Sequence, residues 1–522
     1  MMPTYDFDQI DQAAHDAEAG KLVSPSSDRA EKGAVTMSAT QEYRQYIGGD
    51  WVGAAGGGTY DDRDPFTGDV VATAPAAGAG DATSAVEAAS SAFAGWSQTP
   101  PAERQRIFLK AADLLEARRD EVVAMLARET GATFGFGMFQ SFFVPNLFRQ
   151  AAALAYASLG QILPSDTGAF AMGIRKPAGV VGAFAPWNAA LILSARSIAA
   201  PLALGNTVVL KPSEWSPWSG GLLWGEIFAE AGLPGGVLNI VTHAPGEAGP
   251  IGAVLIEHPA VRRLNFTGSS AVGRLIAEAA GRQLKRVVLE LGGSNPLLVL
   301  ADADLEYAVN ASAFGSFLHQ GQICMSTRRI LVERPIADEF VAKLAAKTKT
   351  LKTGDPKEHD TIIGPLINED ALNMVKRRVD AAVGAGATVL VGGDVVGPCF
   401  QATLLTDVPA DSEFAQHETF GPVASVEVIE SAEDGVARAN ATSYGLSAGI
   451  ITSNRERGFA LAQQIDSGIV HVNDQTVADE PQMPFGGVKD SGFGRFGGQA
   501  VIDEFTELRW VTLRAGGHPF PF

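Results

Sequence analysis

Residues 262–293 read RRLNFTGSSAVGRLIAEAAGRQLKRVVLELGG, and this stretch decides the fold class. The run RRLNFT (262–267) predicts a strand, and it leads directly into an FTGS turn. An alanine-rich amphipathic helix follows the turn, and VVLELGG (287–293) predicts the next strand. A strand, a helix and a strand in succession indicate a protein of the α/β class.

The same alternation extends in both directions from this stretch. Upstream, short apolar runs predict further strands at VVGAFA (180–185), NTVVL (206–210) and GVLNIVT (236–242). A helix is predicted over residues 218–232, with Gly232 as its C-cap. Downstream of Glu290 the pattern restarts, so a second α/β unit is expected to begin near residue 290.

Length and charge exclude several functional classes. The chain has 522 residues, of which 46% are hydrophobic, and its net charge of −19 argues against binding to a phosphate backbone. No apolar run is long enough to span a membrane, and the first residues lack the apolar region of a secretory signal. We expect a cytoplasmic protein without nucleic-acid or membrane partners, with a poorly ordered extension over 1–40 and Met37 as a candidate start.

The chain contains two cysteines, Cys324 and Cys399. Two thiols do not make a disulfide framework, and no Cys/His cluster has metal-ligand spacing, so no metal site is expected. Each cysteine alone is most simply a small buried hydrophobe. Whether Cys324, in FLHQGQICMSTRR (317–329), is instead a reactive thiol depends on the residues that accompany it.

One glycine-rich motif is misleading. GFGRFGG (492–498) matches the dinucleotide-binding spacing GxGxxG through Gly492, Gly494 and Gly497. No strand is predicted before it, no good helix follows it, and the acidic partner that such motifs require is missing. A flexible turn is therefore the preferred interpretation.

Polar residues at predicted strand ends form a candidate site. Ser269 begins the helix after FTGS, where free backbone N–H groups can hold an anion. Asn188 lies just past strand 180–185, and its amide could donate to a developing oxyanion. Lys211 and Glu214, in TVVLKPSE, offer a donor and an acceptor for ribose hydroxyls at a sheet edge. Taken singly, these residues are equally well a helix cap, a turn asparagine and a solvated surface pair.

Glu290 and Cys324 add reactive groups to this set. Glu290 ends an apolar strand beside paired glycines, and apolar surroundings should raise its carboxyl pKa so that it can accept a proton from water. A capping or salt-bridged glutamate is the alternative. Cys324 follows after one more predicted strand and helix, which is enough chain to return to the same sheet edge.

The ordered motifs PWN (186–188), KPSE (211–214), FTGS (266–269), ELGG (290–293), GQIC (321–324) and ETFGP (418–422) resemble those of the aldehyde dehydrogenase superfamily. The resemblance runs from about residue 42 to FTELRW (505–510). It implies an aldehyde dehydrogenase-like α/β fold with a Rossmann-type cofactor domain, an α/β catalytic domain and a small β arm.

The resemblance also implies a role for each matching residue. Cys324 would be the nucleophile that forms a thiohemiacetal and then a thioester, and Glu290 would activate the water that hydrolyses it. The Asn188 side chain and the Cys324 backbone N–H would form the oxyanion site. The cofactor-binding residues implied are Pro186, Trp187, Lys211, Glu214, Phe266, Thr267, Gly268, Ser269, Leu291, Glu418 and Phe420.

The expected cofactor is NAD. A carboxylate at Glu214 would accept a hydrogen bond from the ribose 2′-hydroxyl and repel a 2′-phosphate, although Lys211 nearby could permit NADP. The chain departs from the family at one point: where many members carry a glutamate after the arginine of the C-terminal glycine-rich segment, Phe496 follows Arg495. Glu290 is therefore expected to act without that auxiliary acid.

An aromatic aldehyde is the expected substrate. The segment TFGFGMFQSFFVPNLF (133–148), with Trp187 and Phe485, offers flat walls that suit an aromatic ring, although these phenylalanines could equally be helix core. QICMSTRRI (322–330) and the 479–510 region resemble the vanillin, benzaldehyde and salicylaldehyde dehydrogenase group. The alternatives are an aliphatic or semialdehyde dehydrogenase and a cofactor-independent thiol hydrolase that pairs Cys324 with His319.

The resemblance also suggests how the chain is divided. We expect an NAD-binding domain (41–289) interrupted by an arm (160–178), a catalytic domain (290–490), and a C-terminal return (491–522) with an oligomerisation strand near 508–514. Strand edges in such arms pair across subunit boundaries. A homodimer or homotetramer is therefore expected.

Overall fold

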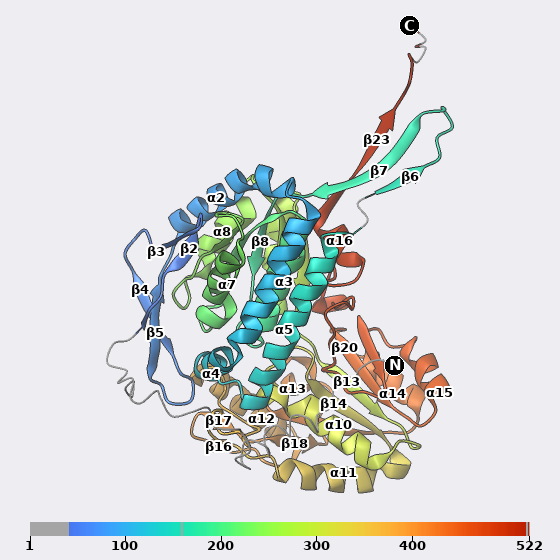
Figure 1. Cartoon of the computed structure of the whole chain (residues 1–522). Helices are drawn as coiled ribbons and strands as arrows, with labels where there is room; N and C mark the ends of the chain where they lie inside the picture. The colour runs from blue at the N-terminus through green and yellow to red at the C-terminus, as the bar shows by residue number, and fades with distance from the viewer. Residues whose placement is uncertain (1–40, 158–159, 518–519, 521) are drawn as a thin grey trace, which may run out of the picture. The chain divides into compact units, whose positions relative to one another are not determined.

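The structure is a computed structural model that describes residues 41–157, 160–517, 520 and 522 (Figure 1). The expected N-terminal extension and the candidate start at Met37 lie outside the described residues. Residues Gln41–Phe522 form one compact unit. Strands and helices alternate along this unit, which confirms the α/β class.

A mixed sheet occupies the first half of this unit. Among the described residues it has eight strands, in the order β22-β12-β11-β8-β9-β10-β2-β3. Their bounds are β2 Gln45–Ile47, β3 Asp50–Val52, β8 Val180–Phe184, β9 Thr207–Lys211, β10 Leu238–Ile240, β11 Val261–Thr267, β12 Arg286–Glu290 and β22 Gly492–Phe493. The five strands from β12 to β10 are parallel, whereas β22, β2 and β3 join the sheet antiparallel.

Strand β8 is the switch point of this sheet. The chain runs outward from β8 through β9 to β10 on one side, and it then returns to add β11 and β12 on the other. Phe184 at the end of β8 is in register with Lys211 of β9 and Phe266 of β11. Ligands of open α/β sheets bind at the carboxyl ends of strands beside such a point, so the end of β8 is a candidate ligand site.

Helices cover both faces of this sheet. One face packs on α2 (Ala79–Ser97), α8 (Ala248–Glu257) and α9 (Ser270–Arg282). The other packs on α3 (Pro101–Ala117), α5 (Phe134–Leu154), α6 (Ala190–Ala203) and α7 (Leu223–Ala231), while α4 (Arg119–Thr130) packs against α5. Because both faces are covered, the central strands β8 and β9 are buried at every position and mostly apolar.

A second sheet begins immediately after Glu290. Within the described residues it has seven strands, in the order β15-β18-β19-β14-β13-β20-β21. Their bounds are β13 Asn295–Val299, β14 Thr327–Glu333, β15 Thr388–Val391, β18 Thr403–Thr406, β19 Val423–Ile429, β20 Ser447–Ile451 and β21 Ile469–Val472. Helices α10 (Leu305–Phe317) and α11 (Arg334–Lys349) pack on one face, and α14 (Ala432–Asn440) and α15 (Arg455–Ala462) on the other.

The remaining elements are short or peripheral. They are β1 Gln41–Glu42, β4 Thr59–Arg63, β5 Val70–Pro75, β16 Val395–Val396, β17 Cys399–Phe400, α12 Glu369–Gly384, α13 Glu413–Gln416, α16 Ala500–Phe505 and the single turns η1 Trp218–Leu222, η2 Leu318–Gly321 and η3 Lys489–Ser491. Strands β1, β5 and β4 form one small sheet, and β16 and β17 form another.

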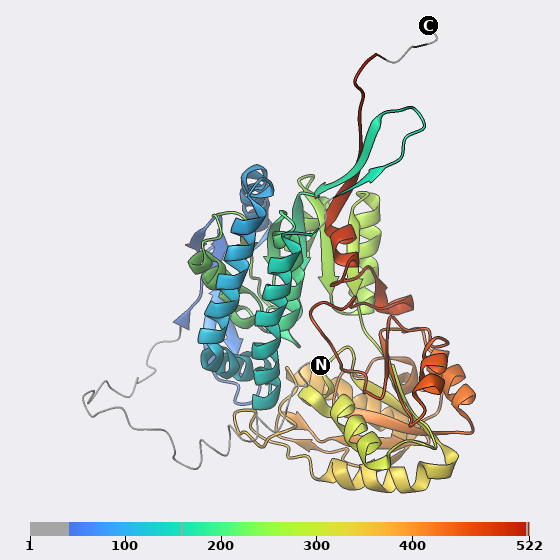
Figure 2. The ribbon, with the colours of Figure 1, turned by 45° about the vertical axis from the view of Figure 1, so that its right-hand side comes forward.

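The expected arm is a three-stranded antiparallel sheet. Strand β7 (Phe170–Pro177) lies between β6 (Gly160–Leu163) and β23 (Thr506–Leu513). In both ribbon views these strands extend away from the eight-stranded sheet (Figures 1 and 2). The division of the chain into a cofactor domain and a catalytic domain stays a prediction.

Local details differ from the sequence expectations in two places. The helix predicted over 218–232 starts as the π-helical turn η1 and becomes α-helical at Leu223; at its end Gly232 has φ +92°, as a C-cap glycine requires. The GFGRFGG segment is a turn, as expected, but its first two residues also form the edge strand β22 beside β12. Side chains of β12 are thereby covered by a segment from the far end of the chain.

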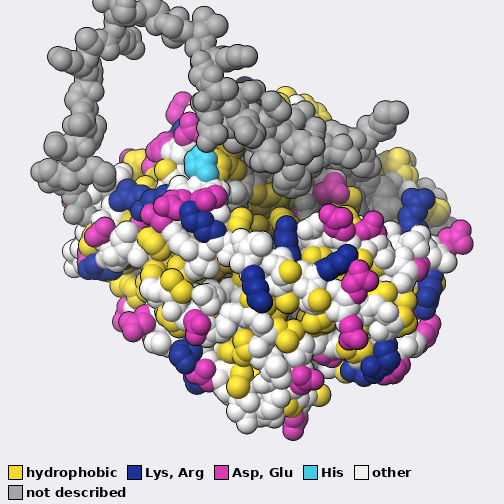
Figure 3. Space-filling view, turned by 90° about the horizontal axis from the view of Figure 1, so that it is seen from below, with side chains coloured by type: hydrophobic (Ala, Val, Ile, Leu, Met, Phe, Trp, Pro, Cys, Tyr) yellow, Lys and Arg dark blue, Asp and Glu magenta, His cyan; other side chains and the backbone are white. Residues whose placement is uncertain are grey.

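Surface charge agrees with the expectation from composition. On the face shown in Figure 3, acidic and basic side chains are interspersed with apolar ones, and the basic side chains visible there do not gather into one patch. No helix in the described part of the chain has both the length and the apolar character to cross a membrane.

Candidate active site

Cys324 lies in a tightly held loop between η2 and β14. Directly before this loop, His319 and Gln320 have positive φ angles of 49° and 53°, a conformation that side chains other than glycine rarely adopt. Gln320 Nε2 donates to the carbonyls of Gly131 (2.9 Å) and Pro365 (3.0 Å). Strained backbone of this kind persists where the surroundings enforce it, and it is often found at functional sites.

The Cys324 thiol is in a partly buried position beside carboxylates. Burial, and then the negative charges of Glu418 and Glu290, raise the pKa of the Cys324 thiol well above its usual value. Arg196 opposes this effect. The Cys324 carbonyl accepts from Asn295 Nδ2 at 2.8 Å, which ties the loop to the first residue of β13.

Asn188 approaches the same loop from the end of β8. Its side chain is buried, and its Nδ2 donates to the Gln322 carbonyl at 2.9 Å. Gln322 in turn holds the Ile367 N–H through its side-chain oxygen at 3.1 Å. The structure therefore brings the Asn188 amide within two residues of Cys324, as the proposed oxyanion role requires.

His319 is a poor partner for the thiol. Its ring is stacked on Phe136 with centroids 4.4 Å apart, and burial lowers the pKa of His319 to about 3. Among the described hydrogen bonds, none joins His319 to Cys324. The histidine thus acts as a neutral packing group, which weighs against the thiol hydrolase alternative.

Glu290 is a buried carboxylate without a hydrogen-bond partner. It is the last residue of β12 and is 3% exposed, and neither carboxylate oxygen has a donor among the described residues. Burial raises the pKa of Glu290 well above its usual value, whereas Arg196 and Arg495 counteract this. A side chain on Gly486 would approach Glu290 Oε1 to 2.6 Å, so the glycine leaves room for the carboxylate.

The carboxyl end of β9 carries a buried cation. Lys211 Nζ donates to the Pro212 carbonyl at 3.1 Å and lies 2.7 Å from His243 Nε2. His243 Nδ1 lies 2.9 Å from the Ala244 carbonyl, which can only accept, so Nδ1 carries the proton and Nε2 accepts from Lys211. Burial lowers the pKa of Lys211 to about 8, and burial together with the Lys211 charge lowers the pKa of His243 to about 4. The pair is thus an ammonium and a neutral imidazole.

Glu214 lies beside this pair, with its carboxylate 3.8 Å from His243 Nε2. Ser213 Oγ donates to it at 3.0 Å. Lys211 is buried and does not form the solvated surface pair that remained an alternative from the sequence. Sequence reasoning did not identify His243, because it belongs to no motif and follows β10 as one residue of an ordinary loop.

The carboxyl end of β11 forms a compact turn into α9. Ser269 caps the helix by accepting from the Val272 N–H at 3.4 Å, and Gly268 N–H donates to the Glu290 carbonyl at 3.0 Å. A Cβ on Gly268 would lie 2.5 Å from the Phe266 ring, so a glycine is required between Thr267 and Ser269. Leu291 packs against Gly273 of the same helix. The turn that leads into α9 is thus tied to the backbone at the end of β12.

A further wall comes from the second sheet. The Phe420 and Trp187 rings are perpendicular, with centroids 5.7 Å apart, and Pro186 and Trp187 are half-buried. Glu418 Oε1 accepts from the Gly293 N–H at 3.3 Å, and burial raises the pKa of Glu418 to about 7, against the opposing charge of Arg328. Glu418, from the second half of the chain, therefore contacts the segment that follows Glu290.

Phe485 is fully packed and is covered by a cation. The Arg196 guanidinium carbon lies 4.3 Å from the Phe485 ring centroid and 5.6 Å from that of Phe143. Arg196 Nη2 also forms a 2.6 Å ion pair with Asp479, and both side chains are buried. Neither Arg196 nor Asp479 was identified from the sequence, because a contact between helix α6 and a loop near the C-terminus leaves no local pattern.

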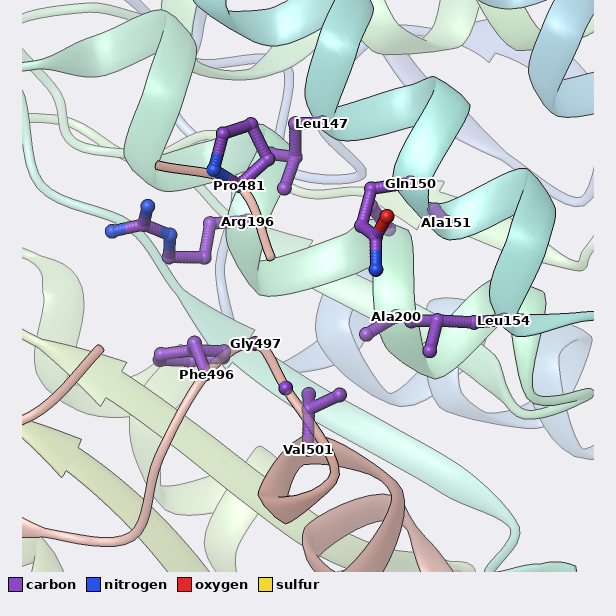
Figure 4. Close-up of a pocket in the computed structure, with 12 residues that line it drawn as sticks. Leu147, Gln150, Ala151, Leu154, Arg196, Ala200, Pro481, Phe496, Gly497 and Val501 are labelled. Atoms are coloured by element: carbon purple, nitrogen blue, oxygen red, sulfur yellow. The ribbon is translucent and has the colours of Figure 1, made fainter. Parts of the chain in front are cut away.

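A small, partly open pocket adjoins this pair (Figure 4). Its walls come from α5, α6 and the 481–501 segment, including Leu147, Gln150 and Phe496. In Figure 4 the Arg196 guanidinium points away from Gln150 and Val501. The Arg196 stem therefore forms a wall of this pocket, and its charged end lies on the side of Asp479.

Comparison with protein families places these residues in context. A model of the aldehyde dehydrogenase family matches residues 51–511. Vanillin dehydrogenase from Pseudomonas fluorescens is 48% identical over 476 residues, which cover 91% of this chain and 98% of that protein. A benzaldehyde dehydrogenase (NAD(+)) from Pseudomonas putida is 42% identical over 482 residues, covering 92% of this chain and 98% of that protein.

Solved structures agree with the sequence comparisons. A salicylaldehyde dehydrogenase from Pseudomonas putida, crystallised with salicylaldehyde, superposes with a TM-score of 0.90 at 40% identity, covering 92% of this chain and all of that chain. An NAD-dependent aldehyde dehydrogenase from Sinorhizobium meliloti gives a TM-score of 0.89 at 36% identity, covering 92% of this chain and 96% of that chain.

Proposed function

The chain belongs to the aldehyde dehydrogenase family, and we propose that it oxidises an aromatic aldehyde to the carboxylate with NAD as cofactor. The observation that carries this proposal is the convergence of three groups in one place. A thiol at Cys324, an amide donor at Asn188 and an unpaired buried carboxylate at Glu290 come from the loop before β14, the segment after β8 and the end of β12.

In this proposal the protein residues act in sequence. The Cys324 thiolate adds to the aldehyde carbon, and the oxygen that becomes negative receives hydrogen bonds from the Asn188 amide and the Cys324 N–H. After oxidation the acyl group is held as a thioester on Cys324. Glu290 takes a proton from water, the hydroxide attacks the thioester, and the carboxylate leaves as the thiol is restored.

The residues at the switch point fit a dinucleotide. The first turn of α9 offers backbone N–H groups for a pyrophosphate, and Lys211 and Glu214 offer a donor and an acceptor for ribose. Glu418 and Phe420 would hold the nicotinamide end. When bound, the cofactor supplies the acceptor for the hydride that the thiohemiacetal loses.

The aromatic substrate is supported by relatives and by the walls of the site. The vanillin, benzaldehyde and salicylaldehyde dehydrogenases named above act on aromatic aldehydes. In this chain Phe143, Phe485 and Trp187 lie near the catalytic groups and offer ring faces and edges. We also propose a cytoplasmic location, which the two free thiols support.

A substrate panel tests the proposed function. With NAD, we expect the catalytic efficiency for vanillin, benzaldehyde and salicylaldehyde to exceed that for succinic semialdehyde and hexanal by about tenfold or more. Formation of reduced cofactor would be followed by absorbance, and the carboxylate product by mass spectrometry. A preference for an aliphatic semialdehyde, or ester hydrolysis without NAD as the main activity, would contradict the proposal.

The contact between His243 and Lys211 predicts a specific cofactor defect. In His243→Leu the Lys211 ammonium loses an acceptor in a buried place, so we expect the Kd for NAD to rise about tenfold, as for a lost hydrogen bond to a charged group. In His243→Gln the amide oxygen can accept from Lys211 in place of the His243 Nε2 lone pair, so the affinity for NAD should largely return. Fluorescence or calorimetric titration with NAD measures this, alongside kcat, which should change much less.

The same contact predicts a pH dependence of cofactor binding. Because the pKa of Lys211 is lowered to about 8, the ammonium is present below that pH and is lost above it. Affinity for NAD should therefore weaken as pH rises through about 8. His258→Leu, in the loop after α8, is the control for His243→Leu and should leave NAD affinity unchanged. If the two variants weakened NAD binding equally, the role given to the contact between His243 and Lys211 would be contradicted.

The arm is proposed to join subunits into a homodimer or homotetramer. Its strands expose large apolar side chains, among them Ile162 (72%), Leu508 (56%) and Trp510 (77%). Such surface needs a partner, and a second copy of an arm with free strand edges can supply one. We expect Trp510→Arg to shift the mass measured by light scattering toward the monomer, whereas Leu284→Arg, at an exposed apolar residue after α9, should not. An unchanged mass in Trp510→Arg would oppose this role.

A further inference from the structure

We propose that Arg196 and Asp479 form a subsite that binds a hydroxyl group on the ring of the aldehyde. This inference rests on the proposed function and makes it more specific, because it selects hydroxylated aromatic aldehydes among aromatic ones. Its basis is the geometry of one buried ion pair and of the atoms that the pair leaves unused.

The pair is held rigidly. Arg196 projects from α6, and its Nη2 donates to Asp479 Oδ2 at 2.6 Å, with side-chain exposures of only 5% and 8%. The guanidinium plane is supported by Phe485 at 4.3 Å, and Phe143 lies 5.6 Å away. Few movements remain open to a guanidinium that is stacked on a ring and paired with a carboxylate.

The pair leaves one donor and one acceptor unused. Arg196 Nη1 and Asp479 Oδ1 are buried and have no hydrogen-bond partner among the described residues. Buried polar atoms without partners are rare, and each costs free energy unless something binds it. A buried ion pair is also weak evidence for a purely stabilising role, because desolvation offsets much of its attraction.

The unused atoms lie close to the reacting groups. Phe485, on which the guanidinium rests, directly precedes Gly486, and a Cβ on Gly486 would lie 2.6 Å from Glu290 Oε1. Phe485 and Phe143 belong to the same apolar cluster that Cys324 contacts. The charges of Arg196 and Asp479 also act on the pKa of both Cys324 and Glu290, which requires that the pair lie near them.

A hydroxyl is the substituent that satisfies both atoms. It can accept from Arg196 Nη1 and donate to Asp479 Oδ1 at the same time, which requires one donor and one acceptor side by side. A methoxy group can only accept, so it would leave Asp479 unpaired. A carboxylate would be repelled by Asp479, and an unsubstituted ring would leave both atoms unsatisfied.

The first test uses the unmodified enzyme with matched substrates. The catalytic efficiencies of 2-, 3- and 4-hydroxybenzaldehyde would be compared with those of the three methoxy isomers and benzaldehyde. We expect at least one hydroxy isomer to exceed both its methoxy counterpart and benzaldehyde by about tenfold, since an unpaired buried group weakens binding by that order. Equal efficiencies across the three series would overturn the subsite.

The second test removes both charges together, so that neither is left buried alone. In the double variant Arg196→Met/Asp479→Leu, the preference for the hydroxy isomer over benzaldehyde should fall to near unity, whatever the overall rate. The control is the double variant Arg263→Met/Glu507→Leu, which removes another 2.6 Å ion pair with a buried arginine, between β11 and β23, and should keep the preference.

The two hypotheses fail in different ways. If the chain oxidises only aliphatic aldehydes, the proposed function is wrong. If benzaldehyde is a good substrate but the double variant retains the hydroxyl preference, the subsite alone is wrong. Arg196→Lys gives a further readout, because it keeps the charge but not the planar fork, and it should reduce the preference without abolishing folding.

Discussion

Cys324→Ala is expected to lower aldehyde-dependent reduction of NAD by about 10⁴-fold or more, as the loss of a covalent nucleophile does elsewhere. Cys399→Ala is expected to stay near the wild-type rate. The two thiols are chemically the same, so the difference must come from their surroundings.

Those surroundings differ in what accompanies each thiol. Cys324 has the Asn188 amide, Glu290 and a strained loop around it. Cys399, in β17, is 1% exposed and its only described polar contact is to the Gly354 carbonyl at 3.9 Å. Burial raises the pKa of both thiols, so the expected difference in reactivity comes from the groups beside each cysteine and not from its pKa.

Three measurements separate chemistry from folding. Steady-state rates show the loss of activity, NAD titration shows whether the cofactor site is intact, and mass spectrometry of enzyme quenched with substrate shows which cysteine carries the acyl group. Retained turnover in Cys324→Ala, or an acyl group on Cys399, would rule out the mechanism.

Sequence reasoning worked where function follows strand ends. Asn188, Lys211, Thr267 and Glu290 were each predicted at or just past a strand end, and β8, β9, β11 and β12 are neighbouring parallel strands in the structure. The roles of these four residues stay predictions. The restart of the pattern after Glu290 likewise matches the change from the first sheet to the second. Both features depend on local periodicity, which a sequence displays directly.

The contacts that sequence reasoning missed join distant segments. Arg196 and Asp479 belong to no motif and are paired only by the fold. His243 was overlooked for the same reason, since its contact with Lys211 depends on how β9 and β10 lie side by side. Folding buries these polar side chains. A charge that would be expected in solvent is then fixed in the core, and some of its atoms lack hydrogen-bond partners.

The arm shows a third situation. The resemblance implied an arm over 160–178 and a strand near 508–514, and in the structure β6, β7 and β23 pair within one chain. The purpose of their apolar surface is decided only in an assembly. Trp510 is 77% exposed in the single chain, and the single chain does not show which surface covers this side chain in an assembly. Light scattering therefore adds information that neither the sequence nor one chain contains.

Glu290→Gln is the second large effect expected. Glutamine keeps the size of the side chain but cannot take a proton from water, so thioester hydrolysis should slow by about 10²–10⁴-fold. Formation of the thioester does not use Glu290 in this mechanism, so the variant should still give a rapid burst of reduced cofactor of about one per active site. Enzyme quenched after the burst should carry the acyl mass on Cys324.

The pH dependence provides the discriminating control for that variant. Burial raises the pKa of Glu290, so the carboxylate form that acts as base is scarce at low pH and increases as pH rises through the raised pKa. Turnover limited by hydrolysis should therefore climb with pH in the wild-type enzyme, and this rise should disappear in Glu290→Gln.

Glu333→Gln, at a buried carboxylate in the second sheet, should keep both turnover and the pH profile. A Glu290→Gln enzyme with undiminished turnover and no acyl intermediate would show that another group activates the water.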